Sequence, residues 1–387
     1  MLPSVNLRFN RHELAGAFGD IGTDLPLIAS ILLATKLDAA GVFVAFGLAQ
    51  IASGLLYGLP MPVQPLKAMA VVVIAGQATG GQLQLAGLMI GALMLGLTFS
   101  GLLDRLQQVI PVLVVRGIQA GLGIALARTA LGLAGREGTI GWIAAALAVL
   151  VLVWLRGHPK LPGALVVVGA GALWAACYRL NWTALAHGFG WVTPVPATLP
   201  WADWATALVL LVLPQVPLSL SNSVIATQRT VNDLFPDRPV TLRGIGRTYS
   251  VMNLLSPWVG GIPMCHGCGG LAGYYALGAR TGGSVMIYGS LYLVVGLLFS
   301  GVFQEVLRAF PAPVLGAVLL VEAGVLFLLL RDVASSRAAL ALAGIVALVC
   351  VFAPQGYLTG MLVGCALYYL LRRWNPSLAL NPVHSPG

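Results

Sequence analysis

Long apolar runs alternate with short polar links along the whole chain. Because a helix needs about 20 apolar residues to cross the hydrocarbon core of a bilayer, these runs predict membrane-spanning segments. The first seven lie at about 12–34, 38–57, 60–76, 82–104, 108–131, 139–155 and 160–179. The second seven lie at about 204–228, 244–259, 261–279, 282–304, 310–330, 336–353 and 356–373. The pattern predicts an all-α polytopic membrane protein with 14 transmembrane segments.

Short sequence words recur in the same order in the two halves of the chain. The matched pairs are FSG at 99–101 and 299–301, GLPM at 58–61 with GIPM at 261–264, and Pro111 with Pro311. An odd number of spans in one copy inverts the next copy in the membrane, which is a common plan of secondary transporters. We therefore expect a 7+7 inverted repeat, with the copies at 1–180 and 204–373.

The third and tenth segments begin with residues that do not suit a helix. Three prolines stand between positions 60 and 65, and the second copy has IPMCH at 262–266 followed by glycines. A short extended stretch followed by a half-helix would still cross roughly 35 Å of membrane. We therefore expect half-helices over 65–76 and from Gly267 or Cys268 onward.

Two half-helices related by an inverted repeat should point their N-termini at a common place near the bilayer midplane. Irregular backbone at that depth is tolerated only when it is buried in protein or lines a polar cavity. The free amides and partial positive charge of a helix start favour an anion, and a tetrahedral oxyanion suits this pair. The alternative is a pair of proline kinks in ordinary helices with no ligand.

Composition supports the membrane assignment. Of 387 residues, 58% are hydrophobic and 9% are charged, and the mean hydropathy is +0.91, whereas about 25% of residues are charged in a soluble domain.

The net charge of +9 does not indicate nucleic-acid binding, because the basic residues are scattered at the ends of apolar runs. They fall mostly on one side, which predicts cytoplasmic termini in a cell membrane, inner or plasma. The opposite side would hold Lys36, Arg128, Arg136, Arg179 and Arg308.

The cysteines predict neither disulfides nor a metal site. There are five of them, and most lie within apolar runs, where a cysteine behaves as a small hydrophobe. CHGC at 265–268 has two cysteines, but a structural zinc site needs four ligands and no second pair is present. We expect no metal and no cofactor. The small-residue pattern GIQAGLG at 117–123 predicts a helix-packing face.

Polar residues near the two helix breaks are candidates for binding the anion. Gln64 and His266 precede the half-helices, and Lys67 adds a positive charge to the first; His266 has a backbone-anchoring role as its alternative. Asn222 is costly in a membrane helix without a partner, and Ser221 is its neighbour. The candidate substrate-binding residues are Thr23, Gln64, Pro65, Leu66, Lys67, Ser221, Asn222, His266, Gly267, Cys268, Gly269 and Gly270.

Four charged residues inside spans are candidates for proton coupling or ion pairing, because an intramembrane charge is expensive. Asp20 is the leading candidate, and its alternative is a structural ion pair with Lys67 or Arg116. Asp24 lies one helical turn after Asp20. Arg116 favours a structural or gating pair, and Glu322 has the same choice between pairing and proton coupling. Lys67 itself could face the anion, pair with Asp20, or extend its charge to the membrane interface.

Five stretches resemble the signature segments of the molybdate transporter family, which is related to the sulfate permeases. They are ELAGAFGDIGTDLPL (13–27), YGLPMPVQPLKAMA (57–70), VVRGIQAGLG (114–123), PLSLSNSVIAT (217–227) and PMCHGCGGLAGYYALGARTGG (263–283). Asp24 and Cys268 depart from the residues usual there. The resemblance implies the 7+7 fold, with a core domain from segments 1–4 and 8–11 and a gate domain from segments 5–7 and 12–14. The chain stops soon after the last predicted span, so no cytoplasmic regulatory (STAS) domain is expected.

We therefore expect a secondary active transporter, not an enzyme, that imports an oxyanion by moving the core domain against the gate domain. The residues alone indicate an anion transporter; molybdate, with sulfate and tungstate as close alternatives, and protons as the coupled ion are what the resemblance adds. Rivals are a dicarboxylate or nucleobase permease of the same fold and a passive anion channel. Many relatives dimerise through gate helices, so a homodimer in the lipid bilayer is a candidate assembly.

Overall fold

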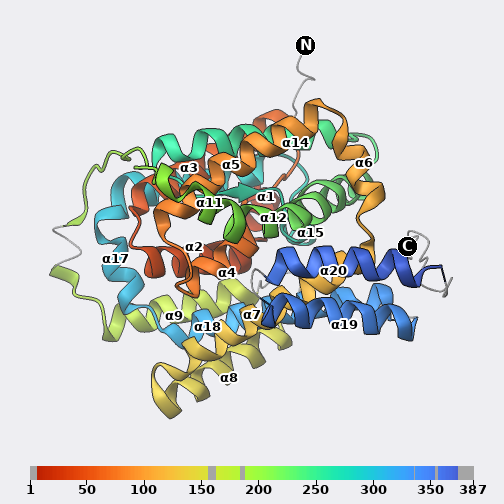
Figure 1. Ribbon diagram of the computed structural model, residues 1–387. Coiled ribbons are helices and arrows are strands. Elements are labelled where there is room, and N and C mark those ends of the chain that lie inside the picture. Colours follow the sequence, from red (N-terminus) through yellow and green to blue (C-terminus); the bar gives the residue numbers. More distant parts are fainter. Residues whose placement is uncertain (1–6, 156–162, 184–187, 335, 354–355, 374–387) are drawn as a thin grey trace.

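The computed structural model describes residues 7–155, 163–183, 188–334, 336–353 and 356–373, and it is almost wholly helical (Figure 1). The first half contains α1 (Arg11–Ala17), α2 (Ile21–Thr35), α3 (Ala39–Tyr57), β1 (Gln64–Pro65), α4 (Lys67–Ile74), α5 (Gly80–Phe99), α6 (Leu102–Val109), α7 (Val112–Gly135), α8 (Gly138–Trp154) and α9 (Gly163–Tyr178). The second half contains η1 (Trp201–Asp203), α11 (Trp204–Ala207), η2 (Leu208–Val212), α12 (Leu213–Leu218), η3 (Ser219–Ala226), α13 (Thr227–Leu234), α14 (Leu242–Leu255), η4 (Ser256–Val259), β2 (Met264–Cys265), α15 (Cys268–Ala276), α16 (Gly283–Val294), η5 (Val295–Phe299), α17 (Ser300–Ala309), α18 (Ala312–Leu328), η6 (Leu329–Val333), α19 (Arg337–Phe352) and α20 (Gly356–Leu371).

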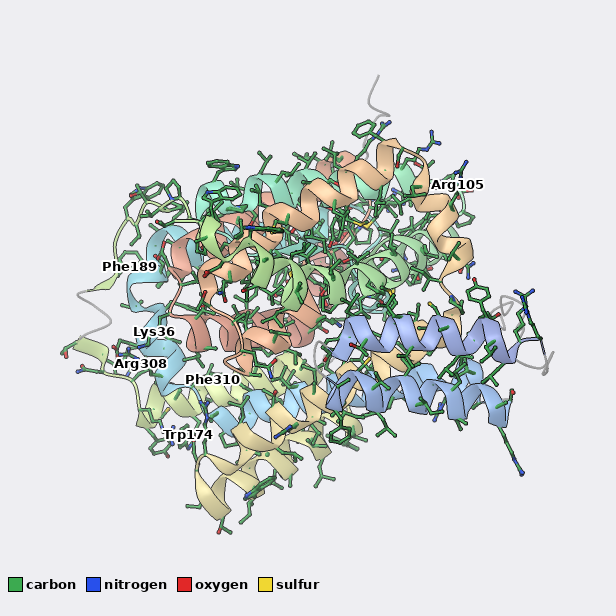
Figure 2. All side chains as sticks on the ribbon, viewed as in Figure 1. Lys36, Arg105, Trp174, Phe189, Arg308 and Phe310 are labelled. Carbon is green, nitrogen blue, oxygen red and sulfur yellow. The ribbon has the colours of Figure 1, made fainter. Side chains whose placement is uncertain are left out.

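Six helices in the described residues are long and apolar enough to cross a membrane. They are Ala39–Tyr57, Gly80–Phe99, Val112–Gly135, Trp201–Leu234, Gly283–Phe303 and Ala312–Arg331. Five shorter apolar helices accompany them, and apolar side chains such as Trp174 on α9 point outward from the bundle (Figure 2). The protein is a helical membrane protein, whereas the count of 14 segments stays a prediction.

The helices form two layers (Figure 1). In this view α7, α8, α9, α18, α19 and α20 make the lower layer, and α2 to α5 with α11 to α16 make the upper layer. Within the lower layer α18 and α19 pack on α7, and within the upper layer α3 packs on α16 and α5 on α14. The layers meet where α2 contacts α18 and where α4 contacts α7.

The repeated words stand at equivalent element boundaries. Pro111 directly precedes α7, and Pro311 directly precedes α18. The glycine of GLPM, Gly58, ends α3 in a left-handed conformation with φ of 62°, and Gly260, just before GIPM, ends η4 with φ of 76°. Glycine reaches this conformation without the penalty that a Cβ imposes. The two halves therefore use the same turn chemistry before each extended stretch.

The first predicted segment is broken in two, contrary to the expectation of one helix over 12–34. Helix α1 ends at Ala17 and α2 begins at Ile21, with Asp20 at the N-cap position of α2. At the break, a Cβ on Gly19 would lie 2.5 Å from the backbone of Gly273. The close approach of α15 explains both the glycine and the break, and it places Asp20 at a helix start and not in mid-helix.

Other predicted boundaries also need correction. The segment predicted over 82–104 ends at Phe99, because Gly101 turns the chain with φ of 69° into the separate helix α6. The segment predicted over 204–228 is part of a continuous helical run to Leu234 that contains π-helical stretches. The π-helical stretch η3 follows Pro217 of α12. A proline inside a helix has no amide hydrogen to donate, so it disturbs the backbone hydrogen bonds of the helix there.

The packing role expected for GIQAGLG is confirmed. A Cβ on Gly117 would lie 2.6 Å from the Cβ of Val346, and one on Gly121 would lie 2.6 Å from the Cβ of Cys350. Both contacts are with α19, so these glycines let α7 and α19 approach closely.

Candidate anion-binding site

The two extended stretches pair with each other, and this pairing positions both half-helices. Strands β1 and β2 are antiparallel, with Gln64 opposite Cys265 and Pro65 opposite Met264. The amide of Leu66 continues the ladder by donating to the Pro263 carbonyl at 3.2 Å. Helix α4 and helix α15 then start on either side of this two-stranded ladder.

Polar side chains from the preceding helices hold the extended backbone in place. Gln50 Nε2 on α3 donates to the Val63 carbonyl at 3.0 Å, and Ser53 Oγ donates to the Met61 carbonyl at 2.9 Å. In the second half, Asn253 on α14 donates to the Met264 carbonyl at 2.6 Å and accepts from the amide of the same residue at 2.9 Å. Buried backbone groups are costly when unpaired, so these side chains are what make irregular backbone tolerable at this depth.

Helix α4 begins at Lys67, two residues later than predicted, and its first amides are not free. Gln215 Oε1 on α12 accepts hydrogen bonds from the amides of Ala68 at 3.0 Å and Met69 at 3.3 Å. Gln215 Nε2 in turn donates to Ser219 Oγ at 3.2 Å. The expectation that free amides of α4 would hold the anion therefore does not fit this conformation, because a protein side chain occupies two of them.

Lys67 pairs with Glu322 and not with Asp20. The Lys67 ammonium forms an ion pair with Glu322 Oε1 on α18, and the two side chains are only 18% and 17% exposed. Thr23 Oγ1 on α2 lies 3.5 Å from Glu322 Oε2 as its hydrogen-bond donor. Three candidates named from the sequence, Thr23, Lys67 and Glu322, thus meet at the boundary between the two layers.

Asp20 and Gln64 form a second buried pair. Gln64 Nε2 donates to Asp20 Oδ1 at 2.6 Å and to Oδ2 at 2.8 Å, and both residues are almost fully buried. A Cβ on Gly270 would overlap both side chains, and one on Gly267 would overlap Gln64. These two glycines therefore make room for the Asp20–Gln64 pair against the first turn of α15.

Helix α15 begins at Cys268, as the sequence predicted, and its start is open. In the described part of the chain, no carbonyl or carboxylate accepts from the amides of Cys268, Gly269 or Gly270. A Cβ on Gly269 would meet nothing within 4 Å. Beside this opening, the Cys268 thiol donates to Asn222 Oδ1 at 3.2 Å, and the Lys67 ammonium lies within electrostatic range of the same thiol.

His266 is anchored to the backbone, which was the alternative considered for it. Its Nδ1 lies 2.9 Å from the Pro62 carbonyl, which can only accept, so Nδ1 carries the proton. Its Nε2 lies 2.8 Å from Thr248 Oγ1, and the ring packs edge-on against Tyr57. With both ring nitrogens engaged, the histidine ties the two extended stretches together in this conformation.

Asp24 is fully buried in a pocket of tyrosines. Tyr292 on α16 donates to Asp24 Oδ2 at 3.3 Å, and the hydroxyls of Tyr288 and Tyr292 lie 2.7 Å apart. Asp24 Oδ1 has no hydrogen-bond partner among the described residues. Asp24 therefore lies in the upper layer, bonded to Tyr292 and within electrostatic range of Asp20 and Lys67.

Arg116 on α7 donates to Gln119 Oε1 at 2.9 Å on its own helix, and it lies within electrostatic range of the Cys268 thiol. The side chain of Ser221 lies outside the described residues. Of the candidate residues, the structure therefore brings together two groups, Lys67 with Glu322 and Thr23, and Asp20 with Gln64, beside the open start of α15.

Comparison with known proteins assigns the chain to a family. A family model described as "Molybdate transporter of MFS superfamily" matches residues 12–126 and 207–327. The chain is also 33% identical over 356 residues to Molybdate transporter 2 of Arabidopsis thaliana, covering 80% of this chain and 76% of that protein. The chain belongs to the molybdate transporter family. Its named relatives are transporters and not enzymes.

Solved structures show the fold that this molybdate transporter family member adopts. SLC26A9 superimposes with a TM-score of 0.69 at 14% identity, covering 94% of this chain and 65% of that one. The transmembrane domain of BicA, a cyanobacterium bicarbonate transporter, superimposes with a TM-score of 0.66 at 16% identity, covering 93% of this chain and 98% of that one. The protein therefore has the fold of SLC26-type anion transporters.

Two contacts in this family member were not found from the sequence. Gln215 was only one of several polar residues in its span, and nothing local indicates that it caps α4. Glu13, almost fully buried, accepts from the amides of Thr281 at 2.9 Å and Ser284 at 3.2 Å, so it caps the start of α16. A carboxylate inside the first predicted span was the available signal for Glu13, and the helix N-terminus is what stabilises it.

Proposed function

We propose that this protein is a secondary active transporter that imports molybdate, held as an oxyanion at the start of α15. The observation that carries the proposal is the first turn of α15, where no carbonyl or carboxylate of the described residues accepts from the amides, and where the Lys67 ammonium lies within electrostatic range of the Cys268 thiol. Amides of a helix start suit an anion, and the ammonium of Lys67 adds a full positive charge. In this proposal, Asn222 and Cys268 shape the wall of the site.

The proposed mechanism moves the upper layer as a core domain against the lower layer as a gate domain. The proposal includes fourteen membrane segments in two inverted copies. The antiparallel pairing of β1 with β2 and the matched prolines before α7 and α18 support it. An anion bound at α15 and Lys67 would then travel with the core domain, because both elements belong to the upper layer.

Proton coupling follows from the charges around the site. Among the described side chains there, the carboxylates of Asp20, Asp24 and Glu322 outnumber the basic groups of Lys67 and Arg116. Adding a dianion to this excess of negative charge is unfavourable in a poorly solvated place. Protons that enter with the anion relieve the repulsion, so we propose that molybdate moves together with at least one proton.

The proposed orientation places both termini in the cytoplasm of a cell whose inner or plasma membrane holds the protein. Lys36 and Arg308 lie at one end of the molecule and Arg105 lies at the opposite end (Figure 2). The first two are among the few basic residues expected outside, and Arg105 is among the many expected inside.

Uptake of radiolabelled molybdate into liposomes carrying the purified protein tests this function. We expect accumulation that depends on an inward proton gradient and that equal sulfate reduces only partly. Complete displacement by equal sulfate would overturn molybdate as the substrate. Flux that ignores the gradient would overturn coupling and indicate a passive anion channel.

The matched control is the Glu137→Gln variant, because Glu137 pairs with Arg179 between α8 and α9 and away from the site. It removes a carboxylate from an ion pair without touching α4, α15 or α18. We expect its uptake to equal that of the unmodified protein.

A further inference from the structure

The ion pair between Lys67 and Glu322 joins the two layers at the place where the anion is proposed to bind. Lys67 is the first residue of α4 in the upper layer, and Glu322 lies in the middle of α18 in the lower layer. Both side chains are largely removed from solvent, and such a pair needs its partner because a lone buried charge is strongly unfavourable. Any group that takes Lys67 away from Glu322 must therefore leave Glu322 in a form that tolerates the loss.

The Lys67 ammonium also lies near the start of α15. It lies within electrostatic range of the Cys268 thiol at that start and of the Asp20 carboxylate. Asp20 is satisfied by two hydrogen bonds from Gln64, so it does not require the ammonium. Lys67 thus pairs with Glu322 and also lies within electrostatic range of the start of α15.

We infer that Lys67 exchanges partners during transport: it binds the Glu322 carboxylate in the empty carrier and the oxyanion in the loaded carrier, while Glu322 takes up the co-transported proton. This inference rests on the proposed function. An ionised Glu322 beside a bound oxyanion would repel it. A protonated Glu322 carries no charge and has a hydroxyl that can donate to an oxyanion oxygen.

Thr23 supports this exchange from α2. Its hydroxyl lies against Glu322 Oε2, the oxygen that the ammonium does not bind. A hydroxyl can donate to a carboxylate and can also accept from a carboxylic acid. Thr23 therefore offers a hydrogen-bond partner to Glu322 in both protonation states and holds the side chain in place when Lys67 leaves.

The elements packed against α18 carry further charged or titratable residues. Helices α2, α7, α8 and α9 and the turn η6 pack against α18. Helix α8 carries no charged residue. The titratable or charged residues on the remaining elements are Asp24 on α2, with Asp20 at its N-cap, Arg116 and Arg128 on α7, Cys177 and Tyr178 on α9, and Arg331 and Asp332 on η6. Of these, Asp20 lies within electrostatic range of Glu322 as a second negative charge.

The test is the Glu322→Gln variant, which keeps the shape of a protonated glutamate and cannot release a proton. Molybdate binding is measured by equilibrium dialysis at intervals between about pH 5.5 and 8.5. For the unmodified protein we expect the Kd to rise with pH, by up to about tenfold per pH unit for one linked proton. For Glu322→Gln we expect tight binding that does not change with pH.

Transport separates the two roles further. Glu322→Gln should exchange molybdate across the liposome membrane in counterflow, yet fail to accumulate it under a proton gradient. Lys67→Gln should bind molybdate at least tenfold more weakly at every pH, in the presence or absence of the Glu322 change. Glu137→Gln is the control for loss of a paired carboxylate, and thermal unfolding of every variant establishes that it is folded.

A wild-type pH slope in Glu322→Gln, or undiminished affinity in Lys67→Gln, would overturn the exchange. If Glu322→Gln is not folded, Glu322→Asp replaces it: a shorter acid should keep the pH slope with weaker coupling, and loss of the slope would contradict the inference. Failure of the proposed function is distinguishable, because the unmodified protein would then neither bind nor accumulate molybdate.

Discussion

The starts of α4 and α15 share a backbone plan and differ in what surrounds them. Each follows a short extended stretch, and the stretches pair with each other. At α4, Gln215 accepts hydrogen bonds from two backbone amides, and Lys67 forms an ion pair with Glu322. At α15, glycines replace side chains and no carbonyl or carboxylate among the described residues accepts from the first amides. Two helix starts with the same backbone plan can therefore have different roles. The start of α4 supplies the Lys67 ammonium, and the start of α15 supplies backbone amides as hydrogen-bond donors.

One continuous helical run reaches both helix starts. Gln215 on α12 presents its amide oxygen to α4, whereas Asn222 on η3 presents its amide oxygen to the Cys268 thiol. The π-helical turn between them shifts the register of side chains along this run, and such turns are frequent at functional sites. The difference between the two starts therefore comes from the neighbouring helix as much as from the starts themselves.

The largest expected effect comes from Gly270→Ala, which adds a Cβ where Asp20 and Gln64 already lie. Overpacking of this kind costs about 1–3 kcal/mol, and the displaced pair would enter the open site. We expect molybdate uptake to fall more than tenfold. Gly344→Ala on α19 is the matched control, because its Cβ meets no atom within 4 Å and it lies outside the site, so the fold should keep its thermal stability. Equal uptake by Gly270→Ala and the unmodified protein would remove the steric argument.

Gln215→Leu tests whether the α4 amides bind the anion once they are released. It removes the acceptor of two amides and a donor to Ser219, and unsatisfied buried groups cost about 1–3 kcal/mol. We expect a lower melting temperature and no gain in molybdate affinity, although two α4 amides are released. Tighter binding by this variant would indicate that the α4 amides, and not those of α15, hold the anion.

Cys268 reports whether the anion sits at α15. In a protein with Cys177→Ser and Cys365→Ser changes, Cys268 is the remaining cysteine that is not buried. We expect molybdate to slow its reaction with a small methanethiosulfonate reagent several-fold, because the anion covers the first turn. An unchanged rate at saturating molybdate would place the anion elsewhere.

Tyr292→Phe has the smallest expected effect. It removes the hydroxyl that donates to Asp24 Oδ2, a contact worth about 0.5–1.5 kcal/mol when neutral. Because the variant keeps the Asp24 carboxylate and leaves the Lys67–Glu322 ion pair in place, we expect a slightly lower melting temperature and molybdate affinity within about twofold of the unmodified protein. A loss of coupled uptake with intact stability would instead assign the proton to Asp24.

The sequence predicted the two helix breaks well because their cause is local. The prolines before α4 cannot continue a helix and Gly267 before α15 weakens one, and both elements start within two residues of the predicted positions. The partners of the polar residues were harder to predict, because they depend on contacts between distant segments. Lys67 was expected beside Asp20 or the anion, yet it pairs with a residue 255 positions away. Gly19 marks the break in the first span only once the approach of Gly273 is known.

The position of a bound heavy oxyanion tests most directly whether the anion binds at the start of α15. A cryo-electron microscopy or anomalous diffraction structure with tungstate, a close analogue of molybdate, would locate it by its strong scattering. We expect tungstate within hydrogen-bond distance of the Cys268–Gly270 amides and the Lys67 ammonium, with Lys67 separated from Glu322. Tungstate bound at the α4 amides in place of Gln215, or bound anywhere while the Lys67–Glu322 pair stays closed, would contradict it.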